Sequence, residues 1–459
     1  MDELSLRALL ERATSPEPPL GQIVSNSLRA GRKLRRRRRA TGAALSAAAV
    51  VVAGTVPALT SGPGHTSGPG HKVIEPAPVV VPAPPAGAAT AYVATSANTV
   101  VPISLATNTA GPPIRVPEEL PASLDMAAAA PDGRTVYEVG MNPDVGATVT
   151  PIDTATKTAG PTITLRHDEP TGIAVAPNGK TAYLSASGGL FRISTATNTA
   201  SKAPDCGRLG CGGAMAFSPN GKALYVISGG ARGAKTVIVM RTVGNTVLAS
   251  IKIPANSPGI PFNIGITPNG KTAYVVDGNW EAKPGENSVV PIDLATNTAL
   301  TPIKIMAPGS ADGLVIAPDG RTAYVLSSRA VTPIDVATNR AEPTINLPAT
   351  AGYAYRMAIA PSGKTLYVLT PRGLVPITTS SRTVLPRINV PKLDLFTQLA
   401  ISPDGRTVYV GARITLTRMH HGHRLSKFVG GVVPISTATN TAGGFINVGG
   451  APVAITFAG

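Results

Sequence analysis

A repeated tetrapeptide, Pro-[Asp/Asn/Ser]-Gly-[Arg/Lys], constrains the fold of this chain more than any other sequence feature. After each copy comes a short apolar segment that holds one Tyr, and then a segment of the type Val-x-Pro-Ile-Asp-x-Ala-Thr-Asn-Thr-Ala. A period in the forties with several short strands per unit is typical of a β-propeller. The pattern Pro-[Asp/Asn/Ser]-Gly-[Arg/Lys] recurs at intervals of 42 to 50 residues and begins at Pro131, Pro177, Pro219, Pro268, Pro318, Pro361 and Pro403.

Each unit predicts four strands, A to D. Strand A is the apolar run before the tetrapeptide, as in 173–176, strand B carries the Tyr, strand C holds the Val-x-Pro-Ile segment, and strand D follows, as in 112–116. Gly accepts positive φ and Asn tolerates the left-handed region, so the repeated turns suit A–B and C–D hairpins. Proline cannot donate a ladder hydrogen bond, so we expect strand C to be bulged or to lie toward the blade edge.

The repeat region predicts how the ring closes. It starts with strands B, C and D at 90–116 and finishes with an A-like run at 451–456. Pairing that run into the first blade would leave no open edge. An all-β propeller of eight four-stranded blades, each of about 45 residues, is therefore favoured. Seven blades are the alternative if the terminal pieces do not pair.

The residues before the repeats predict a membrane anchor. Residues 1–39 form a basic segment that ends in Arg35 to Arg39, and 40–60 hold 21 uncharged residues, the length of a transmembrane helix. The arginines favour a cytoplasmic N-terminus and an extracytoplasmic propeller at 89–459, so we expect a single-pass membrane protein. Residues 61–88 are a Gly/Pro-rich linker. A cleaved signal peptide is the alternative reading of 40–60.

Composition excludes several classes. The 48 Gly and 44 Pro among 459 residues exclude a mainly helical protein. Two Cys exclude a disulfide framework and a cysteine-built metal cluster. The net charge of +16 is divided between the basic N-terminal block and a mildly basic repeat region, and aromatic residues make up 4%. Nucleic-acid binding is therefore not expected.

Three segments resemble the YVTN-type β-propeller family, the YncE-like proteins. They are TAYVV at 272–276, IAPDGRTAYV at 316–325 and VTPIDVATN at 331–339. The resemblance covers roughly 89–459 and implies a propeller in an exported protein. It implies no single activity, and fold alone does not fix function. The family is also similar in architecture to lactonase-like and quinoprotein propellers, but no catalytic residue is carried over from either.

The repeat explains most of the aromatic residues and sorts the loops into two faces. In a four-stranded antiparallel blade the A–B and C–D turns lie on one face, here named the turn face, and the B–C and D–A loops lie on the other, the loop face. The turns are uniform and the loops vary, so we expect recognition on the loop face. The tyrosines at the repeat position are expected in the core or between blades: Tyr92, Tyr137, Tyr183, Tyr225, Tyr274, Tyr324, Tyr367 and Tyr409.

Candidate ligand-binding residues come from the variable loops. Trp280 is the single Trp and lies in an insertion, so it is either a contact anchor or part of the local loop packing. Tyr353 and Tyr355 beside Arg356 either stack on a sugar or peptide near the channel mouth or pack in the loop. The remaining candidates would be the first suspects in an enzyme: His167, Asp168 and Glu169.

Two further motifs have narrower interpretations. The His420, His421 and His423 spacing can hold Cu or Zn, but the loop has no carboxylate and several cations, which favours a solvated basic loop that contacts anionic wall polymer or lipid. Cys206 and Cys211 lie in one short loop, and a disulfide is the expected state outside the cell.

The combined hypothesis is a membrane-anchored, extracytoplasmic propeller that acts as a binding scaffold at the cell envelope. Its expected partner is a protein or an envelope polymer, with no cofactor. The alternative is an enzyme of the lactonase or quinoprotein type with its site at the channel mouth. Against that alternative, the sequence shows no Ser–His–acid set, Gly-rich phosphate loop or defined metal constellation.

Overall fold

The computed structural model describes most of the repeat region and none of the predicted leader. The basic segment 1–39, the expected span 40–60 and the linker 61–88 lie outside the described residues. Across the part that is described, no helix has the length and apolar character needed to cross a membrane. The described residues are 90–117, 123–142, 144–166, 168–203, 213–229, 235–254, 260–278, 283–390, 395–420 and 423–459.

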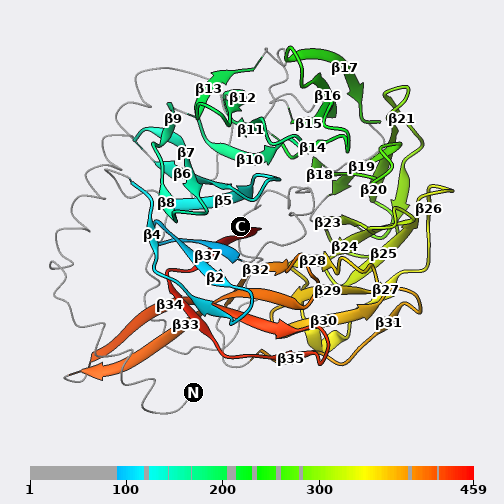
Figure 1. Cartoon of the computed structure of the whole chain (residues 1–459). Helices are drawn as coiled ribbons and strands as arrows, with labels where there is room; N and C mark the ends of the chain where they lie inside the picture. Colours follow the sequence, from blue (N-terminus) through cyan, green and yellow to red (C-terminus); the bar gives the residue numbers. More distant parts are fainter. Residues whose placement is uncertain are drawn as a thin grey trace, which may run out of the picture. The chain divides into compact units, whose positions relative to one another are not determined.

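Eight antiparallel sheets form the blades of a propeller, as Figure 1 shows. Blade 1 combines both ends of the repeat region: β37 (Pro452–Ala458), β1 (Thr90–Thr95), β2 (Thr99–Ser104), β3 (Thr109–Ala110) and β4 (Ile114–Arg115). Blade 2 follows it along the chain: β5 (Ser123–Ala129), β6 (Thr135–Asn142), β7 (Gly146–Asp153), β8 (Thr158–Ala159) and β9 (Ile163–Arg166).

Blades 3 and 4 have four uninterrupted strands each. Blade 3 holds β10 (Pro170–Val175), β11 (Thr181–Ala186), β12 (Gly189–Ser194) and β13 (Thr199–Lys202). Blade 4 holds β14 (Met215–Phe217), β15 (Ala223–Gly229), β16 (Lys235–Arg241) and β17 (Thr246–Lys252).

Blades 5 and 6 have a fourth strand in two pieces. Blade 5 holds β18 (Ile260–Ile266), β19 (Thr272–Gly278), β20 (Asn287–Asp293), β21 (Thr298–Ala299) and β22 (Ile303–Ile305). Blade 6 holds β23 (Ala311–Ile316), β24 (Thr322–Ser327), β25 (Ala330–Asp335), β26 (Arg340–Ala341) and β27 (Ile345–Asn346).

Blades 7 and 8 complete the ring. The 3₁₀ turn η2 (Ala349–Ala351) precedes blade 7, which holds β28 (Arg356–Ile359), β29 (Thr365–Thr370), β30 (Gly373–Thr378) and β31 (Thr383–Val384). Blade 8 holds β32 (Leu395–Ile401), β33 (Thr407–His420), β34 (His423–Ser436), β35 (Thr441–Ala442) and β36 (Ile446–Gly449).

The ring closes by the strand exchange that the sequence predicts. Strand β37 pairs antiparallel with β1, from Thr90 opposite Ala458 to Thr95 opposite Pro452. The first strands of successive blades contact one another all round the ring, and β37 contacts both β5 and β32. Eight blades and a C-terminal closing strand are therefore confirmed.

The hydrophobic core lies between the blades. Eight buried clusters each combine residues of two neighbouring blades, and together they cover all eight interfaces. The cluster between blades 8 and 1, for example, joins Tyr409 and Val432 to Val101 and Phe457. A sheet must bury both faces in this arrangement, which explains why strands B and C are apolar on both sides.

In five blades the repeat tyrosine connects the blade to the next one on the turn face, as the sequence predicts for residues between blades. Tyr274 of blade 5 donates to Asn339 Oδ1 of blade 6 over 2.6 Å, and Tyr409 of blade 8 donates to Asn108 Oδ1 of blade 1 over 2.6 Å. The same Tyr–Asn latch joins Tyr137 to Asn198, Tyr183 to Asn245, and Tyr225 to Asn297. The acceptor in each latch has positive φ at its C–D turn, a conformation that Asn tolerates.

Strand C is not an edge strand, and this corrects the expectation drawn from its proline. The proline is paired with the repeat Tyr inside the sheet, as Pro333 is with Tyr324, and its carbonyl accepts a bond from the following strand, as from Glu342 N at 2.8 Å. The proline has no N–H to donate outward, so strand D breaks opposite it. Blades 3 and 4 have Arg192 and Val239 at that position, and their D strands are continuous.

The last B–C loop, residues 411–431, is a second correction. The sequence favours a solvated basic loop around His420, His421 and His423, but β33 and β34 pair in register along their full length, up to His420 opposite His423. The two strands extend beyond the other blades in Figure 1. Residues 413–417 alternate polar with apolar side chains, with Ile414 and Leu416 as the apolar ones, which is the pattern of a strand and accounts for this hairpin.

Candidate functional site

One-residue β-bulges surround the loop-face end of the channel. Strand A begins at the loop face, and six of the eight A strands shift register near that end. Bulges re-aim side chains and are frequent beside functional sites. Each of these A strands has one extra, unpaired residue at the same place. It comes directly before the residue that pairs with the second residue after the repeat Tyr of strand B. These extra residues are Val453, Asp125, Thr171, Phe262, Asp312 and Thr397.

Arg356 begins strand A of blade 7 at this mouth. Its Nε donates to the carbonyl oxygen of Thr397, the bulge residue of blade 8, over 2.9 Å. Desolvation lowers the pKa of Arg356 to about 10. The guanidinium therefore still carries its charge at neutral pH, held in the wall where water is scarce.

Two exposed tyrosines lie on the loop that enters blade 7. Tyr353 is 57% exposed and Tyr355 is 39% exposed. The guanidinium carbon of Arg329 lies 5.0 Å from the centroid of the Tyr353 ring, a cation–π contact. Together with Arg356, these residues are named the channel-mouth cluster: Arg329, Tyr353, Tyr355 and Arg356.

The loop that carries the cluster is fixed by its backbone. Ala354 N donates to Ser328 O over 2.8 Å, and Tyr355 N donates to Leu369 O over 2.8 Å. Gly352 has φ of 82°, which turns the chain after η2. Both tyrosines are thus presented to solvent from a loop tied to blades 6 and 7, which reduces the entropy lost when a ligand binds.

Asp168 and Glu169 lie in another part of the ring. They belong to the loop between blades 2 and 3, where Asp168 is half-buried and Glu169 is exposed. Glu169 N donates to Ser187 Oγ over 2.9 Å, and the Asp168 carboxylate lies over Gly188. Blade 3 is four blades away from blade 7, so the structure does not bring this pair together with the channel-mouth cluster.

The remaining predicted site residues include five that the structure does not describe. His167, Cys206, Cys211, Trp280 and His421 lie outside the described residues. His420 and His423 are paired residues at the end of the β33–β34 hairpin. Among the described residues, no group of three His, Cys, Asp or Glu is placed to hold a metal ion.

Sequence reasoning missed two buried acidic residues in B strands. Asp277 is 0% exposed and forms an ion pair with Lys235 Nζ of blade 4 at 2.9 Å. Glu138 is also 0% exposed and follows the repeat Tyr, where the other seven blades have Val or Leu. An alignment of the eight repeats would have revealed both residues, because each differs in type from the residues at the same repeat position in the other blades.

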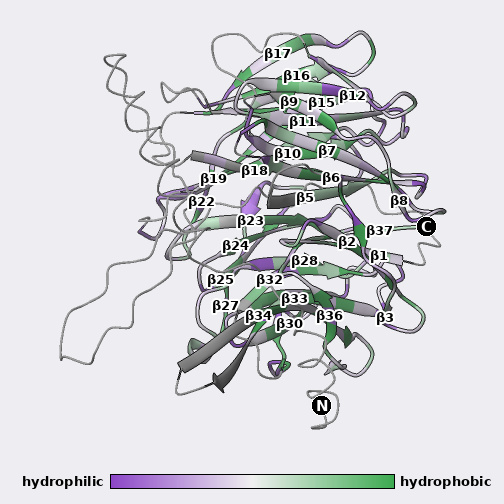
Figure 2. Ribbon diagram, turned by 90° about the vertical axis from the view of Figure 1, so that its left-hand side faces the viewer, coloured by the Kyte–Doolittle hydropathy of each residue, from purple (hydrophilic) through white to green (hydrophobic). Residues whose placement is uncertain are grey.

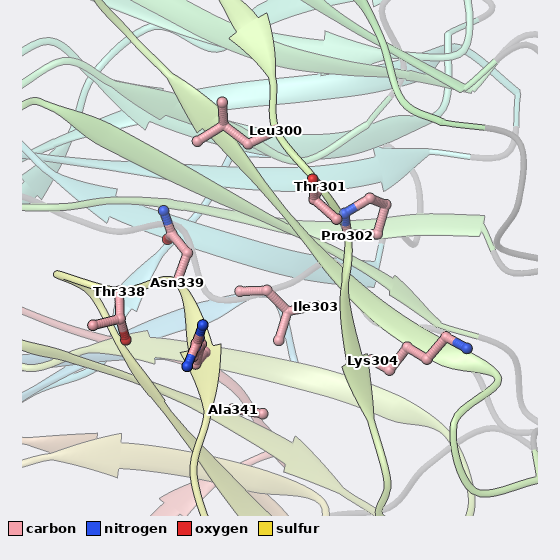
Figure 3. Close-up of a pocket in the computed structure, with 9 residues that line it drawn as sticks. Leu300, Thr301, Pro302, Ile303, Lys304, Thr338, Asn339 and Ala341 are labelled. Atoms are coloured by element: carbon pink, nitrogen blue, oxygen red, sulfur yellow. The ribbon is translucent and has the colours of Figure 1, made fainter.

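The rim holds a separate cavity of about 560 Å³ between blades 5 and 6. Figure 3 shows its two walls, with Ile303 and Lys304 on one side and Thr338 and Asn339 on the other. None of the predicted site residues lines it. Its base includes Asn339, the latch acceptor of Tyr274.

Comparisons with known proteins support the fold. No family model matches the sequence, and no curated protein matches it. The dihydro-heme d1 dehydrogenase NirN, solved in complex with DHE, is similar with a TM-score of 0.59 and 13% identity, over 84% of this chain and 79% of that one. Hydrazine synthase of Kuenenia stuttgartiensis has a TM-score of 0.49 and 19% identity, over 68% of this chain and 97% of that one.

Proposed function

We propose that this chain is a membrane-anchored, extracytoplasmic β-propeller of the YVTN type that binds a cell-envelope ligand through its loop face. The observation that carries the proposal is the channel-mouth cluster: two exposed tyrosines lie on a fixed loop, beside Arg329 in the B–C turn of blade 6 and Arg356 at the start of β28. The turn face is occupied by Tyr–Asn latches, whereas the loop face carries the irregular loops. Binding, not catalysis, is the function that this arrangement favours.

The chemistry of the cluster indicates the class of ligand. An exposed Tyr ring offers a flat apolar surface on which a sugar ring or a peptide group can stack. Arg329, which contacts Tyr353, and Arg356, which follows Tyr355, add positive charge, and an arginine fork suits carboxylate or phosphate. A polymer that repeats a ring and an anionic group satisfies both features, so an anionic envelope glycan is the preferred ligand.

A binding titration tests the proposal. We expect the protein to bind polygalacturonate and to bind dextran, the uncharged control, much more weakly. Tyr355→Ala and Arg329→Gln should each weaken polygalacturonate binding about tenfold, which corresponds to the loss of about 1.4 kcal/mol. Arg321→Gln is the matched control, because Arg321 is an exposed cation in a turn on the opposite face.

Each outcome separates the alternatives. Equal losses for Arg321→Gln and Arg329→Gln would indicate non-specific attraction to a chain of charge +16 and would contradict the proposed site. Turnover of a model lactone, abolished by changes at Asp168 or Glu169, would favour the enzyme. Membrane fractionation with and without residues 40–60 tests the anchor, and release of a shortened mature chain would favour the cleaved signal peptide.

A further inference from the structure

Strand β17 is an outer edge unlike the others in the ring. It is the last strand of its sheet, and in the described part of the chain no strand pairs with its outer side. Its seven residues are continuous because Val239 stands where six blades have Pro. Figures 1 and 2 both show β17 at the periphery of the ring.

The exposed side of β17 is apolar. Val247 and Leu248 are 42% and 46% exposed, and Val243 in the preceding turn is 76% exposed. Leu248 is the extra residue of a bulge between Val247 and Ala249. Edge strands are usually protected by charges, proline or bulges. Strand β17 has a bulge, but that bulge exposes Leu248, and the one charged residue of the strand is Lys252 at its end.

Strand β13 in blade 3 provides an internal comparison. It is the other continuous D strand, because Arg192 replaces the proline there. Its four residues run from Thr199 to Lys202 and include no large apolar side chain, and Lys202 is exposed. Both continuous edges end in an exposed Lys, but only β17 also exposes large apolar side chains, Val247 and Leu248.

The charges around β17 indicate what would cover it. Arg241 and Lys252 are exposed near the two ends of the strand, and residues 235–254 include no Asp or Glu. Lys222 joins them on the turn face, where its carbonyl accepts a bond from Thr242 N at 3.1 Å. A second copy of this chain would bring the same cations to the edge, so charge complementarity favours a partner with acidic residues.

We propose that β17 binds an extended peptide segment of a partner protein as a fifth strand of blade 4. The segment would be apolar at alternate positions, to cover Val247 and Leu248, and would carry acidic residues at its ends, facing Arg241 and Lys252. Backbone hydrogen bonds would supply the pairing and the side chains the selectivity. This site is separate from the channel-mouth cluster and does not depend on the function proposed for it.

The test uses the full-length protein and one defined probe, the fluorescein-labelled peptide Glu-Thr-Val-Thr-Val-Thr-Val-Glu. We expect saturable binding by fluorescence anisotropy. Val239→Pro restores the residue that six sister blades have and should weaken binding at least tenfold. Leu248→Lys should do the same by placing a charge on the edge. Ser201→Lys on β13 is the matched control and should leave binding unchanged.

Peptide controls separate strand pairing from other attraction. A probe N-methylated at every residue has no backbone N–H to donate and should not bind, and a probe with Lys in place of both Glu should bind at least tenfold more weakly. Equal binding of the methylated probe, or an equal loss with Ser201→Lys, would overturn the proposal. So would a protein dimer that Leu248→Lys dissociates, or no binding of the first probe at millimolar concentration. Thermal unfolding of each variant shows that the ring is intact.

Discussion

The two faces of this propeller are built from the same repeat but are used differently. On the turn face, the A–B turns have nearly one sequence, the C–D turn residues share one left-handed conformation, and five Tyr–Asn latches join neighbouring blades. On the loop face, segment lengths differ, the A strands are bulged, and exposed tyrosines appear. The comparison shows that turn sequence and conformation are uniform on the face where latches join neighbouring blades. The latches do not constrain the loops of the opposite face, which can therefore vary in length and sequence.

The largest effect should come from removing the closing strand. Without 452–459, blade 1 loses its innermost strand and the buried Phe457 and Ala458. We expect no cooperative thermal unfolding transition in that truncated chain, measured by circular dichroism. Deleting 414–429 from the hairpin, with a two-residue Asn-Gly turn in its place, is the control and should keep the transition. A cooperative transition without 452–459 would contradict ring closure as the basis of stability.

High pH should destabilise the inter-blade contacts before it affects the loop face. Burial raises the pKa of Tyr137, Tyr274 and Tyr409 to about 12, from 10.0. Their neutral phenols favour the folded state, so stability is complete below pH 10 and falls as pH rises from 10 to 12. Three such groups give a slope of up to about 4 kcal/mol per pH unit. Denaturant unfolding at pH 8, 10 and 11.5 measures it, and equal stability at all three would contradict this account.

A substitution of Gly430, at the base of the β33–β34 hairpin, should destabilise the protein because the loop-face backbone leaves no room there for a side chain. A Cβ on Gly430 would overlap the carbonyl of Gly450, which is backbone and cannot rotate away. We expect Gly430→Ala to cost about 3 kcal/mol in unfolding free energy. Gly444→Ala meets nothing within 4 Å and should change stability by less than about 0.5 kcal/mol. Similar values for the two variants would indicate that the loop-face backbone relaxes freely.

Removing a single latch should have the smallest effect. Tyr274→Phe deletes the bond to Asn339 and leaves a half-buried acceptor without this partner, so we expect a loss of about 1 kcal/mol. Tyr367→Phe is the matched control, because Tyr367 is equally buried but the described structure gives its hydroxyl no bond to Asn440. Chemical denaturation of both variants measures the difference, and an equal loss would mean that packing, not the latch, is responsible.

The sequence predicted the repeating parts of the fold well, because a repeat reports the same physical constraint many times. The period, the buried tyrosines, the Asn turns and the closing strand at 451–456 all follow from it. The prediction drawn from the proline in strand C was wrong, because the missing N–H interrupts the neighbouring strand D and does not place strand C at the sheet edge. The hairpin at 411–431 was missed because its alternation occurs once and has no second copy to compare.

The candidate site was less predictable than the fold. The sequence identified Tyr353, Tyr355 and Arg356 as a group. It did not predict the contact of Arg329 with Tyr353, because strands C and D of blade 6 separate the two residues along the chain. The bulges depend on a register shift of one residue, which strand alternation alone does not reveal. Asp277 and Lys235 meet across a blade boundary, so only the three-dimensional structure pairs them.

The closing strand also affects how the chain can fold during synthesis. Ala451 and Ser96, which bond across the seam, are 355 residues apart in sequence. Seven further blades must therefore emerge from the ribosome before the first blade receives its innermost strand, and contacts of such long range slow folding. Until then β1 presents an open edge to other nascent chains. A propeller closed in this way thus depends on protection of its first-made strands for most of its translation.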